Sequence, residues 1–429
     1  MEFKLIFMSE LAIPHIHKIE GKAGFWAEVT KKGEVHDLKI NTLLGLRQIE
    51  GILIGRRFWE VPLIAARICG ICPVVHVLNC CAAIENAFNL TVSETVILLR
   101  KLILASQIIQ SHTLHLFFMT LADFSNIEND FDVLKRFPKE AKASLAIRDF
   151  SLKATKIIGG RAIHPMSLRV GGFTKLPKKE HLESLLNDYP LVLESALVLA
   201  KLFEKLDYPV LERKTEFLST LSKSEYPLYW APQVMIAGKA LSVGNFYSNQ
   251  IEEDLKNPPV KKVKYQEKPY MLGAIARIKN RADFLNPRAT ELLAEFQKER
   301  AGNFLNVFYN PFYQAVEVVH FLEETEKLIK ILKEKDFTKT PKEFKINKGS
   351  GLSAMEAPRG TLFTYVEVGN DGKVLDCNII TPTAQFLYNL EEDLKDYLPQ
   401  IAKFSHEEKV KKIRALVRVY DPCISCATQ

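Results

Sequence analysis

Four cysteines form two Cys-x-x-Cys pairs at opposite ends of the sequence. Cys69 and Cys72 lie in the segment RICGICPVVH, and Cys423 and Cys426 lie in the C-terminal segment DPCISC. Four thiolates are a soft ligand set that favours zinc, copper(I), nickel or an iron-sulfur centre. A structural zinc site is one interpretation, although its two pairs usually lie about 15–20 residues apart. Here the gap spans nearly the whole chain, so the pairs can share a metal only if the chain closes on itself.

The residues next to the cysteines indicate how each pair is presented. Gly70 permits a tight turn within the first pair, and Pro73 suits the first turn of a helix that begins there. His76 would then lie one turn beyond Cys72, where its imidazole could hydrogen-bond the Cys72 sulfur. Asp421 precedes a proline, which disfavours helical backbone, so we expect Asp421 to be extended and a metal to hold the terminal segment in place.

Two arginines are candidates to balance the charge of a four-thiolate site. Four buried thiolates around one divalent ion keep a net negative charge, which is costly to remove from water unless a further cation lies close. Arg67 lies two residues before the first pair, and Arg359 lies in MEAPRG. The other cysteines fall in a helical pattern (Cys80 and Cys81) or a strand pattern (Cys377), and we expect them to be packed thiols.

The elements that must bring the two pairs together are mainly helical. Hydrophobic periodicity predicts an α+β fold in which helices dominate, with a helical core and peripheral antiparallel β-hairpins. The sequence has no internal repeat and no low-complexity linker, so we expect a single domain over residues 1–429. The predicted long helices cover 77–90, 93–124, 191–206 and 314–335, and the predicted hairpins cover 24–41 and 361–380.

Composition excludes several classes of partner. The net charge of +7 comes from 58 basic and 51 acidic residues that are mixed along the chain, which argues against nucleic acid. The lysine-rich stretch 256–270 also carries prolines and acids, which favours a solvated loop over a binding patch. Arg100 and Lys101 interrupt the apolar run 96–109, so we expect no transmembrane segment. The N-terminus lacks the pattern of a signal peptide, and we therefore expect a cytoplasmic protein.

Together, RICGICPVVH and the terminal DPCISC resemble the large, catalytic subunit of nickel-iron hydrogenases. Further segments agree in order over nearly the full length, namely HIHKIEGKAGF, GLRQIEGILIGR, SHTLHLFF, GGRAIHPMSLRVGG, MEAPRGTLFTY and IITPTAQ. The resemblance implies the fold of that subunit and an enzyme that reversibly cleaves molecular hydrogen into protons and electrons.

The resemblance also implies a nickel-iron centre whose iron carries carbon monoxide and cyanide ligands. Nickel would be bound by Cys69, Cys72, Cys423 and Cys426, and iron by Cys72 and Cys426, which bridge the two metals. The iron would supply the second cation that the charge of four buried thiolates requires.

Several residues without sulfur match the family's segments. Pro358 and Arg359, in EAPRG, would lie over the open side of the centre, and Thr383, in TPT, would hydrogen-bond a cyanide. Glu20, in KIEG, matches a glutamate that relays protons beside a terminal cysteine. Heterolytic cleavage needs such a group, because the proton released to a base, here the Cys423 thiolate, must be carried away.

The resemblance implies a magnesium ion near the C-terminus, bound partly by Glu50 in RQIEG. Family members usually end in a histidine that is another ligand, whereas this sequence has Gln429, whose amide oxygen is also a hard donor. Family precursors carry a tail that is removed after metal insertion. This sequence stops where that tail would be cut, so it corresponds to a mature form or to a protein made without a tail.

Two departures favour the shorter cytosolic branch of the family. Ser111 stands where exported members tend to have an aspartate, and residues 363–364 replace a histidine-rich end of the EAPRG segment. We expect His112, His115 and His164 to be structural hydrogen-bonding groups rather than metal ligands.

The chain has no cysteine set for an electron relay beyond the four at the proposed site, so electrons must leave through another chain. The resemblance implies an iron-sulfur small subunit and, in the cytosolic branch, flavin subunits that pass electrons to NAD(P). Two alternatives remain at this stage. One is a cysteine-ligated zinc protein without redox activity, and the other is a coupling subunit like that of respiratory complex I, whose members usually lack the cysteines.

Overall fold

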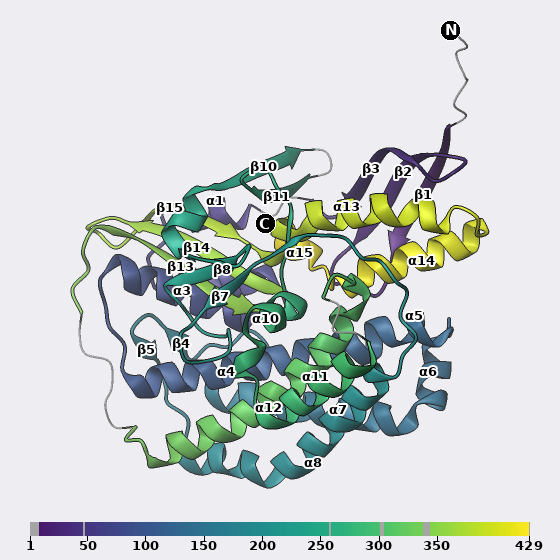
Figure 1. Cartoon of the computed structure of the whole chain (residues 1–429). Helices are drawn as coiled ribbons and strands as arrows, with labels where there is room; N and C mark the ends of the chain where they lie inside the picture. Colours follow the sequence, from purple (N-terminus) through teal and green to yellow (C-terminus); the bar gives the residue numbers. More distant parts are fainter. Residues whose placement is uncertain (1–7, 46–47, 257–258, 301–303, 338–343, 429) are drawn as a thin grey trace.

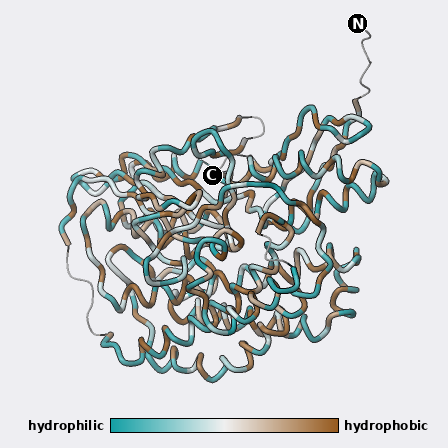
Figure 2. The backbone as a smooth tube through the Cα atoms, viewed as in Figure 1, coloured by the Kyte–Doolittle hydropathy of each residue, from teal (hydrophilic) through white to brown (hydrophobic). Residues whose placement is uncertain are grey.

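A computed structural model describes residues 8–45, 48–256, 259–300, 304–337 and 344–428. Helices dominate, and small antiparallel sheets lie at the periphery (Figure 1), which confirms the predicted fold class. One continuous set of buried apolar side chains runs through these residues. Brown, hydrophobic segments accordingly concentrate inside the molecule and teal segments outside it (Figure 2).

Four long helices pack against one another in the lower half of Figure 1 and form the helical core. They are α4 (Glu94–Leu114), α7 (Pro138–Gly159), α8 (Lys179–Glu204) and α12 (Asn310–Glu334). Helix α12 contacts both α4 and α8, and most of its side chains are buried. Three of these helices were predicted from their apolar periodicity, with α8 beginning earlier than expected.

Helix α4 continues through the π-helical turn η2 (His115–Thr120) into α5 (Leu121–Ser125). By length and composition, the run Glu94–Ser125 could cross a membrane, which the sequence analysis did not expect, but 78% of its apolar window is buried inside the protein. Its fully buried Arg100 donates hydrogen bonds to both carboxylate oxygens of Glu85, at 2.8 and 2.6 Å. This run is therefore typical of a core helix with a compensated charge.

Both predicted hairpins are present, but each belongs to a three-stranded sheet. The sequence did not predict β13 (Gly349–Ala357), which approaches helix α3 (Pro73–Ala87) very closely. A Cβ on Gly349 or Gly351 would lie 2.3 or 1.9 Å from a backbone carbonyl oxygen of α3. Glycine is therefore required at both positions. The two sheets consist of β1 (Met8–Ile16), β2 (Ala23–Thr30) and β3 (Val35–Thr42), and of β13 (Gly349–Ala357), β14 (Gly360–Val368) and β15 (Val374–Ile380).

The prediction of a solvated loop at residues 256–270 is wrong. The segment instead contributes β11 (Pro259–Tyr265), which pairs with β10 (Gln250–Lys256) in an antiparallel hairpin. Lys261 and Lys262 are buried because carboxylates lie opposite their ammonium groups.

The C-terminal end of the chain lies in the middle of the molecule (Figure 1), where it meets the segment that carries Cys69 and Cys72. Helix α3 (Pro73–Ala87) begins directly after Cys72 and packs on β13 and β14. The chain then ends through α13 (Pro382–Ile401), α14 (His406–Val419) and the short α15 (Ile424–Ala427), which packs on α13 and β11.

The remaining elements are α1 (Ile49–Leu53), α2 (Val61–Ala65), η1 (Ala66–Ile68), α6 (Asp130–Arg136), β4 (Leu168–Arg169), β5 (Gly172–Phe173), β6 (Glu216–Phe217), β7 (Ser219–Leu221), β8 (Gln233–Ile236), β9 (Lys239–Ser242), α9 (Val243–Ser248), β12 (Tyr270–Met271), α10 (Ala274–Arg281), η3 (Ala282–Phe284), α11 (Pro287–Glu299) and η4 (Val307–Tyr309).

Candidate metal centre

The fold brings the two cysteine pairs together at one buried point. The Sγ atoms of Cys69, Cys72, Cys423 and Cys426 all lie within 4.8 Å of one another. Across the pairs, the Sγ atoms of Cys72 and Cys426 are 3.5 Å apart, and those of Cys69 and Cys423 are also 3.5 Å apart. The chain therefore closes on itself as a shared site requires, and the four sulfurs form one ligand set.

The first pair is positioned mainly by its own backbone. The backbone is extended at Cys69, then turns, and the N–H groups of Ile71 and Cys72 donate hydrogen bonds to Cys69 Sγ at 3.3 and 3.4 Å. Pro73 occupies the first turn of α3, as predicted. This arrangement directs both sulfurs to the start of the helix and partly satisfies the charge on Cys69.

The second pair is positioned by residues from distant parts of the chain. Thr383 Oγ1 accepts a hydrogen bond from the Cys423 N–H at 3.0 Å, and Thr381 Oγ1 donates one to the Cys426 carbonyl at 3.0 Å. The Ile424 N–H donates to the backbone carbonyl of Glu20 at 2.9 Å. Helix α15 has only four residues, so its own helical hydrogen bonds cannot stabilise it, and these contacts with distant residues hold it in place.

Glu20 lies directly beside the sulfur of Cys423. Its Oε2 accepts hydrogen bonds from Cys423 Sγ at 2.9 Å and from the Ser425 N–H at 3.1 Å. The Ser425 hydroxyl donates to Oε1 at 2.5 Å. Ser425 thus fixes both oxygens of a half-buried carboxylate against one sulfur. Ser425 was not predicted from the sequence, although its place between the two cysteines of CISC was a signal.

Arg359 is held by Asp421, two residues before Cys423. Its Nε donates to the Asp421 carbonyl at 2.6 Å and its Nη2 donates to Asp421 Oδ1 at 2.8 Å. Its buried Nη1 has no hydrogen-bond partner among the described residues. The prediction that Asp421 is extended is wrong, because its φ is +52°, which is a left-handed conformation. In this conformation both the carbonyl and the carboxylate of Asp421 accept hydrogen bonds from Arg359. Arg67, the other candidate for balancing charge, is exposed.

A fully buried cluster holds the backbone that precedes Arg359. Arg277 donates to the carbonyls of residues 357 and 358 at 3.0 and 3.1 Å. It also pairs with both oxygens of Glu317 at 2.6 Å and with Glu356 at 2.9 Å. Burial alone would raise the pKa of Glu317, but the Arg277 charge lowers it to about 2. Glu356 lies in the MEAPRG segment, but no sequence pattern marked Arg277 or Glu317 as its partners, since each is an isolated charge in an apolar stretch.

The three histidines that were expected to be structural make hydrogen bonds away from the sulfurs. His112 Nε2 lies 2.8 Å from Glu317 Oε2, and His164 Nδ1 lies 2.9 Å from the Ala66 carbonyl. His115 bonds the Arg418 carbonyl at 2.7 Å. These contacts confirm the prediction.

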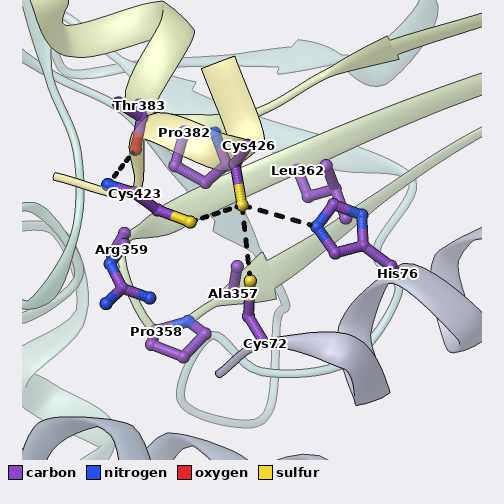
Figure 3. A pocket seen from close by; sticks show the side chains of 10 residues that line it. All are labelled: Cys72, His76, Ala357, Pro358, Arg359, Leu362, Pro382, Thr383, Cys423 and Cys426. Atoms are coloured by element: carbon purple, nitrogen blue, oxygen red, sulfur yellow. Dashed lines mark hydrogen bonds between the residues drawn. The ribbon is translucent and has the colours of Figure 1, made fainter. Parts of the chain in front are cut away.

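A small cavity of about 10 Å³ adjoins Cys72 and Cys426 (Figure 3). That volume suits one water-sized molecule. His76 points at Cys426, with its Nε2 3.8 Å from that sulfur, rather than at Cys72 as predicted. The other lining residues are Ala357, Pro358, Arg359, Leu362, Pro382, Thr383 and Cys423.

The four thiols have unequal proton affinities. Hydrogen bonds from Cys423, Cys426 and Cys72 hold the pKa of Cys69 well below its usual value. Burial raises the pKa of Cys423 and of Cys426 well above the usual value. Without a metal, the site therefore favours a thiolate at Cys69 and thiols at the second pair, and a bound cation must displace those protons.

The three cysteines outside the site are buried and free, as expected. Burial raises the pKa of Cys81 to about 12 and that of Cys377 to about 12. They are therefore packed thiols rather than ligands or nucleophiles.

The surroundings of Glu50 do not fit the magnesium ion that the resemblance implied. Glu50 Oε1 accepts hydrogen bonds from Lys261 Nζ at 2.9 Å and from the Ile379 N–H at 2.6 Å. An ammonium group thus lies where a divalent ion would bind that oxygen. Gln429, the other predicted ligand, lies outside the described residues.

Comparisons with known proteins agree with this geometry. The profile of the family described as nickel-dependent hydrogenase matches residues 47–146. Sulfhydrogenase 1 subunit alpha of Pyrococcus furiosus is 31% identical over 423 residues, which cover 97% of each chain. Sulfhydrogenase 2 subunit alpha of the same organism is 30% identical over 400 residues, which cover 93% of this chain and 94% of that relative.

The fold is similar to that of an NAD+-reducing nickel-iron hydrogenase in the hydrogen-reduced state, with a TM-score of 0.87. The identity is 22%, and the match covers 98% of this chain and 99% of the other. The sequence relatives span almost their whole length, and the four cysteines meet at one point. The chain therefore belongs to the nickel-dependent hydrogenases, as a large, catalytic subunit.

Proposed function

We propose that this subunit reversibly cleaves molecular hydrogen heterolytically at a nickel-iron centre on the four cysteines. The observation that carries the proposal is the position of Cys423 Sγ, which belongs to the sulfur cluster and also lies 2.9 Å from the Glu20 carboxylate. One sulfur thus links the metal ligands to a group that can move a proton.

In the proposed assignment, Cys69, Cys72, Cys423 and Cys426 would hold nickel, and Cys72 and Cys426 would also hold iron. The four soft sulfurs suit this pair of metals. Cys72 and Cys426 line a cavity with apolar walls, which Cys423 also lines, and the iron would lie on that side of the cluster. When bound, the centre supplies the Lewis acidity that polarises hydrogen and the redox capacity that takes up two electrons.

Two polar groups face the same cavity. Arg359 Nη1 is a buried donor without a partner among the described residues, and it can hydrogen-bond a cyanide or stabilise negative charge. The Thr383 hydroxyl accepts from the Cys423 N–H, so its own hydrogen can be donated to a cyanide nitrogen. Pro358 contributes an apolar wall beside them, and His76 can donate to the Cys426 sulfur.

The proton path begins at Cys423 in this proposal. Cleavage of one hydrogen molecule yields two protons and two electrons, and the Cys423 thiolate accepts the first proton. Glu20 Oε2 receives that proton across 2.9 Å and carries it outward, because this side chain is half-buried. Ser425 holds the carboxylate in place through two hydrogen bonds.

The electrons leave through partners that we propose from the resemblance. An iron-sulfur small subunit would take them first, and flavin subunits would pass them to NAD(P) in the cytoplasm. The relatives are named as alpha subunits, which supports a multi-subunit enzyme. The similar fold of a protein named as an NAD+-reducing hydrogenase supports a pyridine-nucleotide acceptor.

An infrared spectrum of the purified complex, with nickel and iron analysis, tests the centre. We expect bands from one carbonyl and two cyanides, with nickel and iron bound. Zinc on the cysteines without those bands would contradict the proposal and favour the structural zinc alternative. The matched sample is the Cys426→Ser complex, which should lose the bands.

Hydrogen-dependent reduction of NAD+ and NADP+ by the same complex tests the acceptor. An artificial viologen acceptor is the control, because it bypasses the flavin subunits. Viologen reduction without pyridine-nucleotide reduction would refute the NAD(P) assignment and leave hydrogen cleavage intact.

A further inference from the structure

Lys261 places its ammonium group among three oxygen atoms that come from three other elements. Its Nζ lies 2.9 Å from Glu50 Oε1 on α1, 2.8 Å from Asn378 Oδ1 on β15 and 3.4 Å from Glu252 Oε2 on β10. Two carboxylates and an amide oxygen are the hard donors that usually surround a divalent cation. Lys261 itself is only 8% exposed, so its charge depends on these oxygens rather than on water.

The oxygens are oriented by further hydrogen bonds. Glu50 Oε1 also accepts from the Ile379 N–H at 2.6 Å. The Asn378 amide nitrogen donates to Glu252 Oε1 at 2.8 Å and to the Tyr247 hydroxyl at 2.9 Å, which turns the amide oxygen towards Lys261. The arrangement is thus a built cation site in which each polar atom has a defined direction.

An ammonium group and a magnesium ion cannot share this site. Magnesium binds oxygen at about 2.0–2.1 Å and prefers octahedral geometry with several waters. An ion bound to Glu50 Oε1 would lie against Lys261 Nζ, and two positive charges at such a distance in a partly buried place repel strongly. Either the lysine or the divalent ion can occupy the site, and the lysine is in place.

We propose that the Lys261 ammonium replaces the divalent cation at Glu50. In this chain a lysine side chain, rather than a bound metal ion, would link the elements around Glu50. The site joins α1, β10, β11 and β15, and β11 also packs on α15, which carries Cys426. The lysine therefore supports the wall against which the second cysteine pair rests. It also frees the region from a need for magnesium.

Magnesium and manganese analysis of the purified wild-type complex is the first test. After treatment with a chelator and desalting, we expect no divalent ion beyond nickel and iron, no manganese bound in equilibrium dialysis, and an unchanged melting temperature. One magnesium or manganese ion per chain that disappears in the Glu50→Gln complex would overturn the proposal. This measurement depends on no lysine variant and is independent of the proposed hydrogenase activity.

Removing the lysine tests whether the oxygens form a cation site. The Lys261→Ala complex should melt at a lower temperature, and magnesium should raise that temperature again while manganese binds at one ion per chain. A folded Lys261→Ala complex that binds no manganese would overturn the proposal.

Lys262→Ala is the matched control, because Lys262 is adjacent, similarly buried and paired with Glu391 Oε1 at 2.5 Å. It should also lower the melting temperature, but magnesium should not restore it. If magnesium raised the melting temperature of both variants to the same extent, the effect of the ion would be general, and the assignment of the cation site to Glu50 would be overturned.

Discussion

The two cysteine pairs contribute equally to the metal site but are positioned by different means. Cys69 receives hydrogen bonds from backbone N–H groups two and three residues away, and helix α3 starts directly after Cys72. The second pair relies on Glu20, Thr381 and Thr383, which lie 40 or more residues away in sequence. The first pair is thus organised by local chain geometry, whereas the second depends on the completed fold. Substitutions at distant residues should therefore affect the second pair most.

The largest effect should follow from Cys426→Ser. A serine hydroxyl is a hard ligand that cannot bridge two soft metals, so we expect loss of bound nickel and of hydrogen turnover. Cys377→Ala is the control, since Cys377 is a buried thiol outside the site. Metal analysis and hydrogen-dependent viologen reduction measure both variants. Full activity in Cys426→Ser would refute its bridging role.

Arg359→Lys should have the next largest effect. An ammonium has its three donors on one nitrogen, so it cannot reproduce the spacing of the guanidinium nitrogens that reach the Asp421 carbonyl, the Asp421 carboxylate and the cavity. We expect turnover to fall about 100-fold, as for loss of one oriented donor at a reacting centre. Arg288→Lys, at an exposed position, should leave turnover unchanged. Wild-type kinetics in Arg359→Lys would remove the guanidinium from the proposed mechanism.

Glu20→Gln should separate metal binding from proton movement. The amide oxygen can still accept from the Ser425 N–H, and the Ser425 hydroxyl can turn to accept from the amide nitrogen. The backbone contact to Ile424 is unchanged, so we expect the metals to stay bound. Because an amide does not relay protons, exchange between hydrogen and heavy water should slow about 100-fold. Glu10→Gln, which alters a carboxylate that accepts from Trp26, is the control. Undiminished exchange would exclude Glu20 from the path.

Thr381→Val should have the smallest effect. The shape of the side chain is kept, but the hydrogen bond to the Cys426 carbonyl is lost. We expect the free energy of unfolding to fall by about 1 kcal/mol in a denaturant titration, with nickel still bound. Thr290→Val, whose hydroxyl bonds only carbonyls at the start of its own helix, should change it less. An equal loss in both variants would argue against the dependence of the second pair on distant contacts.

The same contrast explains what the sequence could predict. The turn at Gly70 and the helix start at Pro73 are local features, and residue type alone determined them. Helix periodicity likewise predicted α12 well. The position of Glu20 followed only from the resemblance, because a glutamate in KIEG carries no local sign of its distant sulfur partner.

The failures concern charges whose partners lie far away in sequence. Residues 256–270 carry prolines and acids among their lysines, and this composition predicts a solvated loop. Lys261 pairs with Glu50 and Lys262 with Glu391, which lie 211 and 129 residues away, and no local pattern reveals these two contacts. Asp421 was expected to be extended because of the following proline, but its contacts with Arg359 stabilise a left-handed backbone.

The separation of the two pairs also sets an order of events during synthesis. Cys72 and Cys426 are 354 residues apart, so at roughly 5–20 residues per second a ribosome finishes the first pair roughly 20–70 s before the second. During that interval the nascent chain presents two thiols without their partners, and such a pair already attracts soft metals. On the proposed assignment, the four-sulfur nickel site is therefore complete only after translation, and until then the first pair is open to other soft metals such as zinc.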